Sequence, residues 1–228
     1  MSKKMMILTV SVAIVATLAQ SPAASGSPHH ISSVGAFNIK GGTATLSSAS
    51  GGTLHCPEVT GSGKYETTTT GTLQLRFGPT CTMTLFGVTD HCQSEAQGAP
   101  HNLVTETGNI WTTTLPFHIG TDDSANNVIL LTPNATGAFA HIECETIFGN
   151  VSTTIEGNGV VGRIKSPPCN TQSKTMTLDF NAPAHGVQEL TKVTGVIYRL
   201  KDGGENAALD LEATATYTDG LGRTLTCT

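Results

Sequence analysis

Apolar and polar residues alternate along much of the chain with the two-residue period of a β-strand. In the segment 72–77, Leu73, Leu75 and Phe77 share one face, and the residues between them are polar. Met176 and Leu178 repeat this pattern within the segment 175–180. Because successive side chains of a strand point to opposite faces, each segment is expected to bury one face and expose the other.

Short runs rich in Thr, Val, Ile and Leu recur about every 8 to 15 residues, separated by Gly, Asn, Asp and Pro. The predicted strands are 35–40, 43–47, 53–59, 71–77, 82–88, 109–115, 127–132, 138–145, 151–156, 160–165, 174–180, 195–200, 209–218 and 223–227. The segment 205–213 could be helical, but it runs directly into alternating threonines, which favours a strand. This spacing predicts an all-β fold, an antiparallel β-sandwich or barrel-like domain with disulfides.

Polar connections are predicted at 90–107, 120–126 and 166–173, and the residues 148–150 (Phe-Gly-Asn) are predicted to form a hairpin tip. Binding residues concentrate on loops of this length.

The N-terminus has the pattern of a secretory signal peptide. Lys3 and Lys4 precede an uncharged apolar stretch at 5–19, and small residues follow at 20–26. We expect residues 1–26 to be the signal peptide and 27–228 a single all-β domain. An uncleaved membrane anchor is the alternative, but a span needs about 20 apolar residues. The prediction is therefore a secreted, extracellular protein with no stable membrane span after processing.

The composition excludes several classes of protein. The 12 Lys and Arg residues are outnumbered by 17 Asp and Glu residues, whereas a nucleic-acid binder needs cations to neutralise phosphates. Only 13% of residues are charged and 38% are hydrophobic, which argues against disorder. Threonine, at 37 residues, supplies the polar strand positions that charged residues fill in other proteins.

The even number of cysteines predicts three disulfides in an oxidising compartment. No two cysteines are closer than 11 positions, so the paired ligands of a structural zinc site are missing. We favour the pairs Cys81–Cys92, Cys56–Cys144 and Cys169–Cys227. The chief rival joins Cys56 to Cys81 and Cys92 to Cys144.

Sequence motifs give no catalytic residue. The chain has no Gly-x-Ser-x-Gly elbow, no His-Glu-x-x-His, no Gly-x-Gly-x-x-Gly that opens a helix and no P-loop. With every cysteine paired, a thiol nucleophile is also unexpected. We therefore predict a non-enzymatic protein without a cofactor.

One strand brings together residue types that can perform chemistry. His141, Glu143 and Glu145 are expected on one face, opposite Cys144. An imidazole and two carboxylates could bind a divalent metal or act as acid and base. No second pair of ligands completes such a site, so we interpret the three as a solvated strand face and predict no metal site.

Other polar clusters are interpreted as ordinary loops. Asp122-Asp123 and Asn126-Asn127 lack the ligand spacing of a calcium loop. Asp90 and His91 are interpreted as loop-capping residues, and His29 and His30 as a disordered leader.

Trp111 is the candidate ligand-binding residue, because an exposed Trp can stack on a sugar ring. A Trp within a core strand is the alternative. Asn134 and Asn150 fit the glycosylation sequon, which matters only in a eukaryotic host.

Several short motifs resemble a group of uncharacterised secreted β proteins found mostly in actinobacteria. The residues that carry the resemblance are 54–56 (Leu-His-Cys), 61–63 (Gly-Ser-Gly), 71–77 ahead of Cys81, 92–94 (Cys-Gln-Ser), 139–144 (Phe-Ala-His-Ile-Glu-Cys), 157–162 (Gly-Asn-Gly-Val-Val-Gly) and 175–180 ahead of 186–188 (Gly-Val-Gln). The resemblance covers about 60% of the chain and implies a secreted single β domain, with no activity or site to transfer. Cys169, Cys227 and the region after Leu200 lie outside it. A fainter likeness, at 42–46, is to secreted biofilm-surface proteins of pseudomonads.

These observations favour a secreted non-enzymatic protein that acts at the cell surface or in the extracellular matrix, by binding or within an assembly. Candidate partners are cell-wall or matrix polysaccharide or another surface protein. The alternative is a secreted carbohydrate-binding module or weak glycan hydrolase that uses Trp111 and the 90–107 loop. A secreted inhibitor or toxin-like factor is a third interpretation, which no residue pattern tests.

We predict that the secreted protein begins between residues 24 and 27, because cleavage after Ala23 or Gly26 places small residues at both recognition positions. N-terminal sequencing of the exported protein checks this. A sequence starting at Met1, or protein that remains in the membrane fraction, would contradict the prediction.

Overall fold

The structure, a computed structural model, describes residues 29–85, 87–94, 108–146 and 149–227. The predicted signal peptide and most of the predicted 90–107 loop lie outside these residues. The chain is all-β, as the sequence predicts, and its sheets are antiparallel. The strands are β1 (His30–Ile31), β2 (Gly35–Ser48), β3 (Thr53–Cys56), β4 (Val59–Tyr65), β5 (Thr70–Phe77), β6 (Thr82–Leu85), β7 (Val88–Ser94), β8 (Ile110–Trp111), β9 (Leu115–Thr121), β10 (Asn127–Leu131), β11 (Ala138–Thr146), β12 (Gly149–Gly157), β13 (Val160–Ser166), β14 (Gln172–Ser173), β15 (Thr175–Phe180), β16 (Lys192–Val193), β17 (Val196–Ile197), β18 (Leu200–Asp202), β19 (Glu205–Tyr217) and β20 (Arg223–Thr226).

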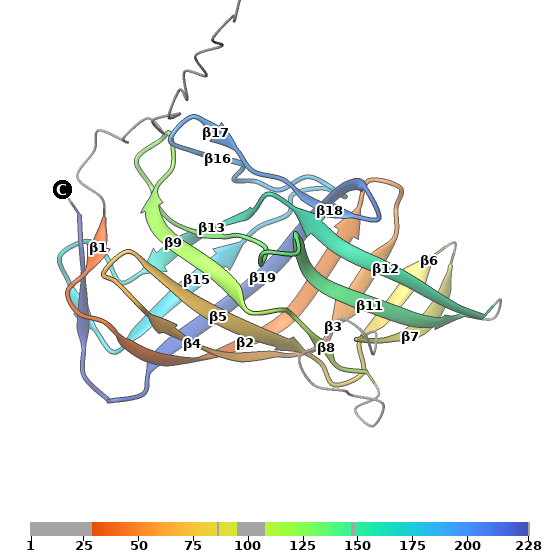
Figure 1. Ribbon diagram of the computed structural model, residues 1–228, viewed down its shortest axis with the longest axis horizontal. Helices are drawn as coiled ribbons and strands as arrows, with labels where there is room; N and C mark the ends of the chain where they lie inside the picture. The colour runs from red at the N-terminus through yellow and green to blue at the C-terminus, as the bar shows by residue number, and fades with distance from the viewer. Residues whose placement is uncertain (1–28, 86, 95–107, 147–148, 228) are drawn as a thin grey trace, which may run out of the picture.

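Two long strands, β2 and β19, form an antiparallel ladder through the middle of the molecule (Figure 1). The first half of β2 pairs with β4 and its second half with β3. In the same way, β19 pairs first with β18 and then with β15. The register of the ladder shifts between Leu211 and Ala213, so a bulge lies where the neighbours change.

The ladder is shared by two closed rings of strands. The first ring runs β2–β4–β5–β9–β10–β13–β15–β19 and returns to β2. The second ring runs β2–β3–β6–β7–β11–β12–β18–β19 and returns to β2. In Figure 1 the strands β6, β7, β11 and β12 of the second ring extend to the right of the molecule. Ring closure pairs strand edges that would otherwise be exposed.

Aromatic side chains fill the first ring. Phe37, Tyr65 and Phe117 contact one another with ring centroids 4.9 to 5.9 Å apart. The Tyr65 hydroxyl donates to the sulfur of Met176 at 3.7 Å, and burial raises the pKa of this phenol well above its ordinary value. This interior is apolar and closely packed.

Glycines on the neighbouring strands leave the space that the aromatic side chains occupy. Phe37 lies opposite Gly63, and Phe117 lies opposite Gly71. A Cβ atom on Gly71 would overlap the carbonyl oxygen of Lys64 and lie 2.6 Å from the Phe117 ring. Because Gly61 and Gly63 occupy inward positions of β4, its sequence lacks the apolar alternation of a strand, and β4 was therefore not predicted.

A second, smaller cluster covers the outside of β10 and β13. Val128, Leu130 and Val161 are buried beneath Val193, with Leu190 and Tyr198 packed against them. Both faces of these strands are therefore covered, and the sequence of β10 (Asn-Val-Ile-Leu-Leu) is accordingly continuously apolar.

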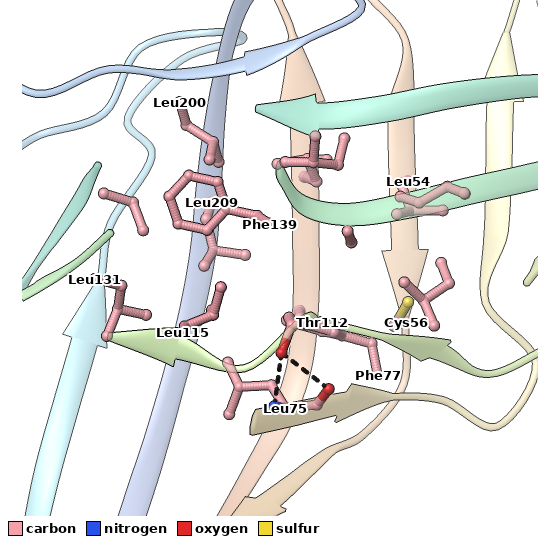
Figure 2. A pocket seen from close by; sticks show the side chains of 17 residues that line it. Leu54, Cys56, Leu75, Phe77, Thr112, Leu115, Leu131, Phe139, Leu200 and Leu209 are labelled. Atoms are coloured by element: carbon pink, nitrogen blue, oxygen red, sulfur yellow. Dashed lines mark hydrogen bonds between the residues drawn. The ribbon is translucent and has the colours of Figure 1, made fainter. Parts of the chain in front are cut away.

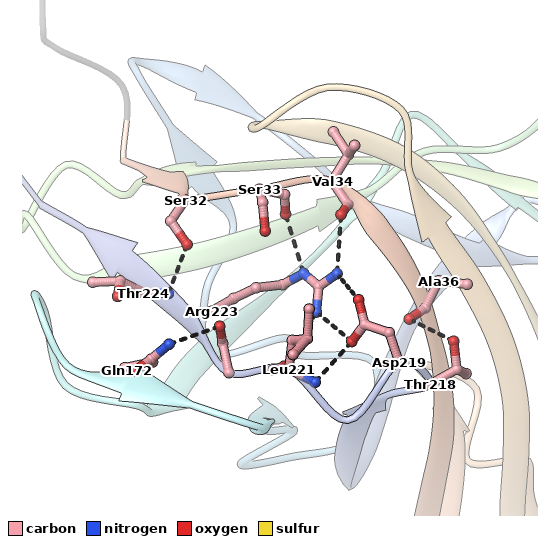
Figure 3. A network of polar contacts seen from close by, with 11 residues as sticks. Ser32, Ser33, Val34, Ala36, Gln172, Thr218, Asp219, Leu221, Arg223 and Thr224 are labelled. Carbon is pink, nitrogen blue, oxygen red and sulfur yellow. Dashed lines mark hydrogen bonds and ion pairs between the residues drawn. The ribbon is translucent and has the colours of Figure 1, made fainter.

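Arg223 joins the segment before β2 to the turn after β19 at one end of the first ring (Figure 3). Its buried guanidinium forms two bonds to the Asp219 carboxylate, at 2.7 and 2.9 Å, and donates to the carbonyls of Ser33, Val34 and Leu221. It also lies 4.3 Å from the centre of the Tyr217 ring. All five N–H donors of the guanidinium are thereby satisfied.

The disulfides are Cys56–Cys81, Cys92–Cys144 and Cys169–Cys227. The third predicted pair is confirmed, and the favoured pairs Cys81–Cys92 and Cys56–Cys144 are wrong. The first four cysteines form one row across β3, β6, β7 and β11, in the order Cys56, Cys81, Cys92 and Cys144. A bridge between the middle two would leave the outer two three strand spacings apart, about 14 Å, beyond the reach of a disulfide. Only the pairing of the first cysteine in the row with the second, and of the third with the fourth, places all four in disulfides.

Several strand predictions change in the structure. The segments predicted as two strands at 35–40 and 43–47 form the single strand β2, and the predicted strand 195–200 becomes β17 and β18. The predicted strand 109–115 ends before a proline. In the structure this segment contains the short strand β8, and β9 begins at Leu115 and continues to Thr121. The preference for a strand at 205–213 is confirmed by β19, and the predicted 138–156 hairpin is confirmed by the pairing of β11 and β12. Of the predicted tip 148–150, Phe148 lies outside the described residues, and Gly149 and Asn150 belong to β12 rather than to the tip, because they pair with Thr146 and Glu145.

The residues 90–94 and 29–30 are also more ordered than the sequence predicts. Asp90 and His91 belong to β7 rather than to a loop, because β6 and β11 pair with it on both sides. His30 pairs with Thr226 in β20, and the His29 side chain is bonded to Asn127. The interpretation of 29–30 as a disordered leader is wrong.

We expect Gly71→Val to lower the free energy of unfolding by about 1–3 kcal/mol, because the new side chain meets backbone and a packed ring. Gly42→Val is the matched control, since a Cβ at Gly42 has no atom within 4 Å, and should change stability by less than about 0.5 kcal/mol. Denaturant unfolding of both variants measures this. Equal effects would contradict the close packing against Phe117.

We expect acid to weaken the end that Arg223 closes. Hydrogen bonds from the Arg223 guanidinium lower the pKa of Asp219 from 3.8 to about 2. As the pH falls, the Asp219 carboxylate is therefore protonated in the unfolded chain before it is protonated in the folded protein. The stabilisation is therefore complete above about pH 4 and is lost toward pH 2. Asp219→Asn should lower Tm at neutral pH and flatten its decline between pH 4 and 2. Asp210→Asn, at an exposed carboxylate on β19, is the control and should keep the wild-type profile.

Candidate functional site

Trp111 is half-buried in β8, which pairs with β5. The guanidinium carbon of Arg76 lies 5.9 Å from the centre of the indole ring. The Trp111 backbone N–H donates to the Ser94 hydroxyl at 2.7 Å, which ties β8 to the end of β7. Trp111 is therefore packed into the wall of the molecule, and it lines none of the hollows described below.

His141, Glu143 and Glu145 share the outer face of β11, as the strand period predicts. The neighbouring residues Ile142 and Cys144 point into the core. A ring nitrogen of His141 lies 3.1 Å from the Thr154 hydroxyl, and the Asn150 amide donates to Glu143 at 2.5 Å. The His141 and Glu143 side chains are thus held by hydrogen bonds between β11 and β12.

The register adds two residues that the sequence did not connect with this face. His91 lies opposite Glu145, and Gln93 lies opposite Glu143. Together with Asn150 they line a hollow of about 70 Å³. The side-chain oxygen of Gln93 is buried and has no hydrogen-bond partner among the described residues. Local sequence gave no signal for this, because β7 and β11 are separated by about 50 positions. Among the residues that the structure describes, no three His, Cys, Asp or Glu side chains are placed to hold a metal ion.

Two further hollows continue along β12. One, of about 250 Å³, is lined by Ser152, Thr153, Thr154, Glu156 and Gly203. The other, of about 600 Å³, is lined by Gly137, Glu156, Gly157, Asn158, Ile197, Arg199 and Lys201. We call the three hollows together the β12 track. The track contains both hydrogen-bond donors and acceptors, and it follows a strand of nine residues, a length of about 30 Å.

The wide end of the β12 track has a fixed backbone. The Asn158 side chain accepts from the Arg199 N–H at 2.7 Å and donates to the Ile197 carbonyl at 2.9 Å. Lys201 lies opposite Glu156 in the β12–β18 pair. This end therefore presents one carboxylate from β12, one cation from β18 and one from Arg199, the residue just before β18.

The Asp122 loop uses its carboxylate oxygens internally. Asp122 accepts the N–H groups of Ser124 and Asn126 and the side-chain amide of Asn126, at 2.8 to 2.9 Å. Asp123 accepts the N–H of Gly195 at 3.0 Å. The Asp122 carboxylate therefore holds its own loop in place, and the Asp123 carboxylate fixes the turn between β16 and β17.

An apolar cavity of about 70 Å³ lies in the interior between the two rings (Figure 2). Its wall includes Leu54 and Cys56 of β3, Leu75 of β5, Leu131 of β10 and Phe139 of β11. Strands of both rings thus line the cavity.

No protein-family model, no curated protein and no solved structure matches this chain. The resemblance to secreted proteins of actinobacteria and pseudomonads therefore stays a prediction. Within the described ranges, no helix has the length and apolar character needed to cross a membrane.

Proposed function

We propose that this chain is an exported, non-enzymatic protein of the cell surface or extracellular matrix that binds polysaccharide along the β12 track. The observation that carries the proposal is the alignment of three polar hollows along one strand, which suits an extended polymer. The three disulfides support export, because such bonds persist in oxidising compartments.

The chemistry of the track favours hydroxyl-rich chains over polyanions. Glu143, Glu145 and Glu156 stand against only Arg199 and Lys201, so the surface offers no excess positive charge. Its hydroxyls, amides and carboxylates provide the donors and acceptors that sugar hydroxyls require.

A carbohydrate-binding module or weak glycan hydrolase centred on Trp111 is the second candidate. The half-buried indole beneath Arg76 favours the β12 track over this alternative, since stacking on a sugar needs an exposed ring face.

We expect Glu156→Ala combined with Lys201→Ala to reduce polysaccharide binding at least tenfold, because both side chains line the widest hollow. A binding screen of the mature protein against purified polysaccharides and cell-wall fractions identifies the polymer, and calorimetry then measures both variants. The matched control is Glu212→Ala with Lys165→Ala, a cross-strand pair in the first ring at 2.7 Å, and should bind normally. Equal binding by the wild type and both double variants would contradict the proposed site.

Trp111 is the only Trp, so its fluorescence reports on its own surroundings. We expect the emission to stay unchanged when polysaccharide is added, and Trp111→Phe to bind as the wild type does. Quenching on binding, together with loss of affinity in Trp111→Phe, would favour the second candidate.

A further inference from the structure

The apolar cavity between the two rings lacks the features that would hold water. Among its described lining residues the one hydroxyl is that of Thr112. This hydroxyl accepts the N–H of Leu75 at 2.9 Å and lies 3.4 Å from the carbonyl oxygen of Leu75 (Figure 2). A buried water needs two to four polar partners, and the cavity offers no unsatisfied one.

Small residues keep this space open. Ala44 of β2 and Ala140 of β11 both line the cavity and are buried. Protein interiors are close-packed, and voids larger than a water molecule are few. A single water needs about 10–15 Å³ of such space, whereas this cavity has about 70 Å³. The cavity is therefore about five to seven times the smallest space that admits a water.

Three lining side chains are only half-buried. Leu46, Leu54 and Phe77 come from β2, β3 and β5, whereas the remaining lining residues are buried. This side of the cavity is where a ligand has the shortest route from solvent.

We propose that the cavity is a binding site for a small apolar molecule, the size of a benzene ring or a five-carbon alkyl chain. The wall supplies dispersion contacts from Leu, Ile, Val and Phe side chains on all sides and no group for acid–base or nucleophilic chemistry. The site therefore binds without reacting. It is independent of the β12 track, which lies on the outer face of the second ring.

The test is thermal unfolding of the mature, disulfide-bonded protein with benzene, n-pentane or naphthalene. Benzene and n-pentane should raise Tm by about 3–6 °C at ten times their Kd, and naphthalene should not. Ala140→Val narrows the cavity and should weaken binding at least tenfold. Ala213→Val, at a buried alanine that does not line the cavity, is the matched control and should keep the Tm shift even if its own Tm is lower.

Nuclear Overhauser effects between ligand protons and the methyl groups of Leu131 and Ile142 give a readout that needs no variant. Their presence with benzene or n-pentane supports the interior site. The absence of both a Tm shift and these effects would overturn the proposal. So would effects confined to surface methyl groups, or unchanged affinity in Ala140→Val.

Discussion

The ladder between β2 and β19 is the interaction on which both rings of the molecule depend. Each ring closes only through this pair, because no other two neighbouring strands belong to both. The bulge between Leu211 and Ala213 lets one ribbon serve two sets of neighbours, since a bulge bends and twists the strand at that point. Loss of the ladder would open both rings and expose unpaired strand edges.

The two rings are stabilised by different means. The first is filled by aromatic side chains that pack against glycines, such as Phe117 against Gly71, and the Arg223 network closes its end. The second ring is joined to the ladder through short pairings, three residue pairs between β12 and β18 and three between β18 and β19. The row of four cysteines adds covalent bonds across the remaining strands. In the chain-entropy model, closing loops of 25 and 52 residues stabilises the fold by roughly 3–4 kcal/mol each.

The different construction of the two rings explains where the β12 track and the apolar cavity lie. The outer face of β12 remains polar because none of the described residues forms a second layer over it, unlike the outer face of β10 and β13 beneath Val193. The apolar cavity lies where the two interiors meet and where the aromatic packing of the first ring gives way to Ala44 and Ala140. Most residues of both regions lie on strands rather than on loops.

The sequence by itself determined the all-β class, most strand positions and the outward face of His141, Glu143 and Glu145, because these follow from the local period of side chains along a strand. It gave the Cys169–Cys227 pair correctly, but the correct pairing of the first four cysteines only as a rival, since the order of strands in the sheet is not a local property. The tertiary structure alone decided that four cysteines form a row, that β4 is a strand despite its glycines, and that His91 and Gln93 join Glu143 and Glu145. Each of these depends on which strands become neighbours, and that is fixed by long-range pairing and by the fit of aromatic rings over glycine, which no local pattern encodes.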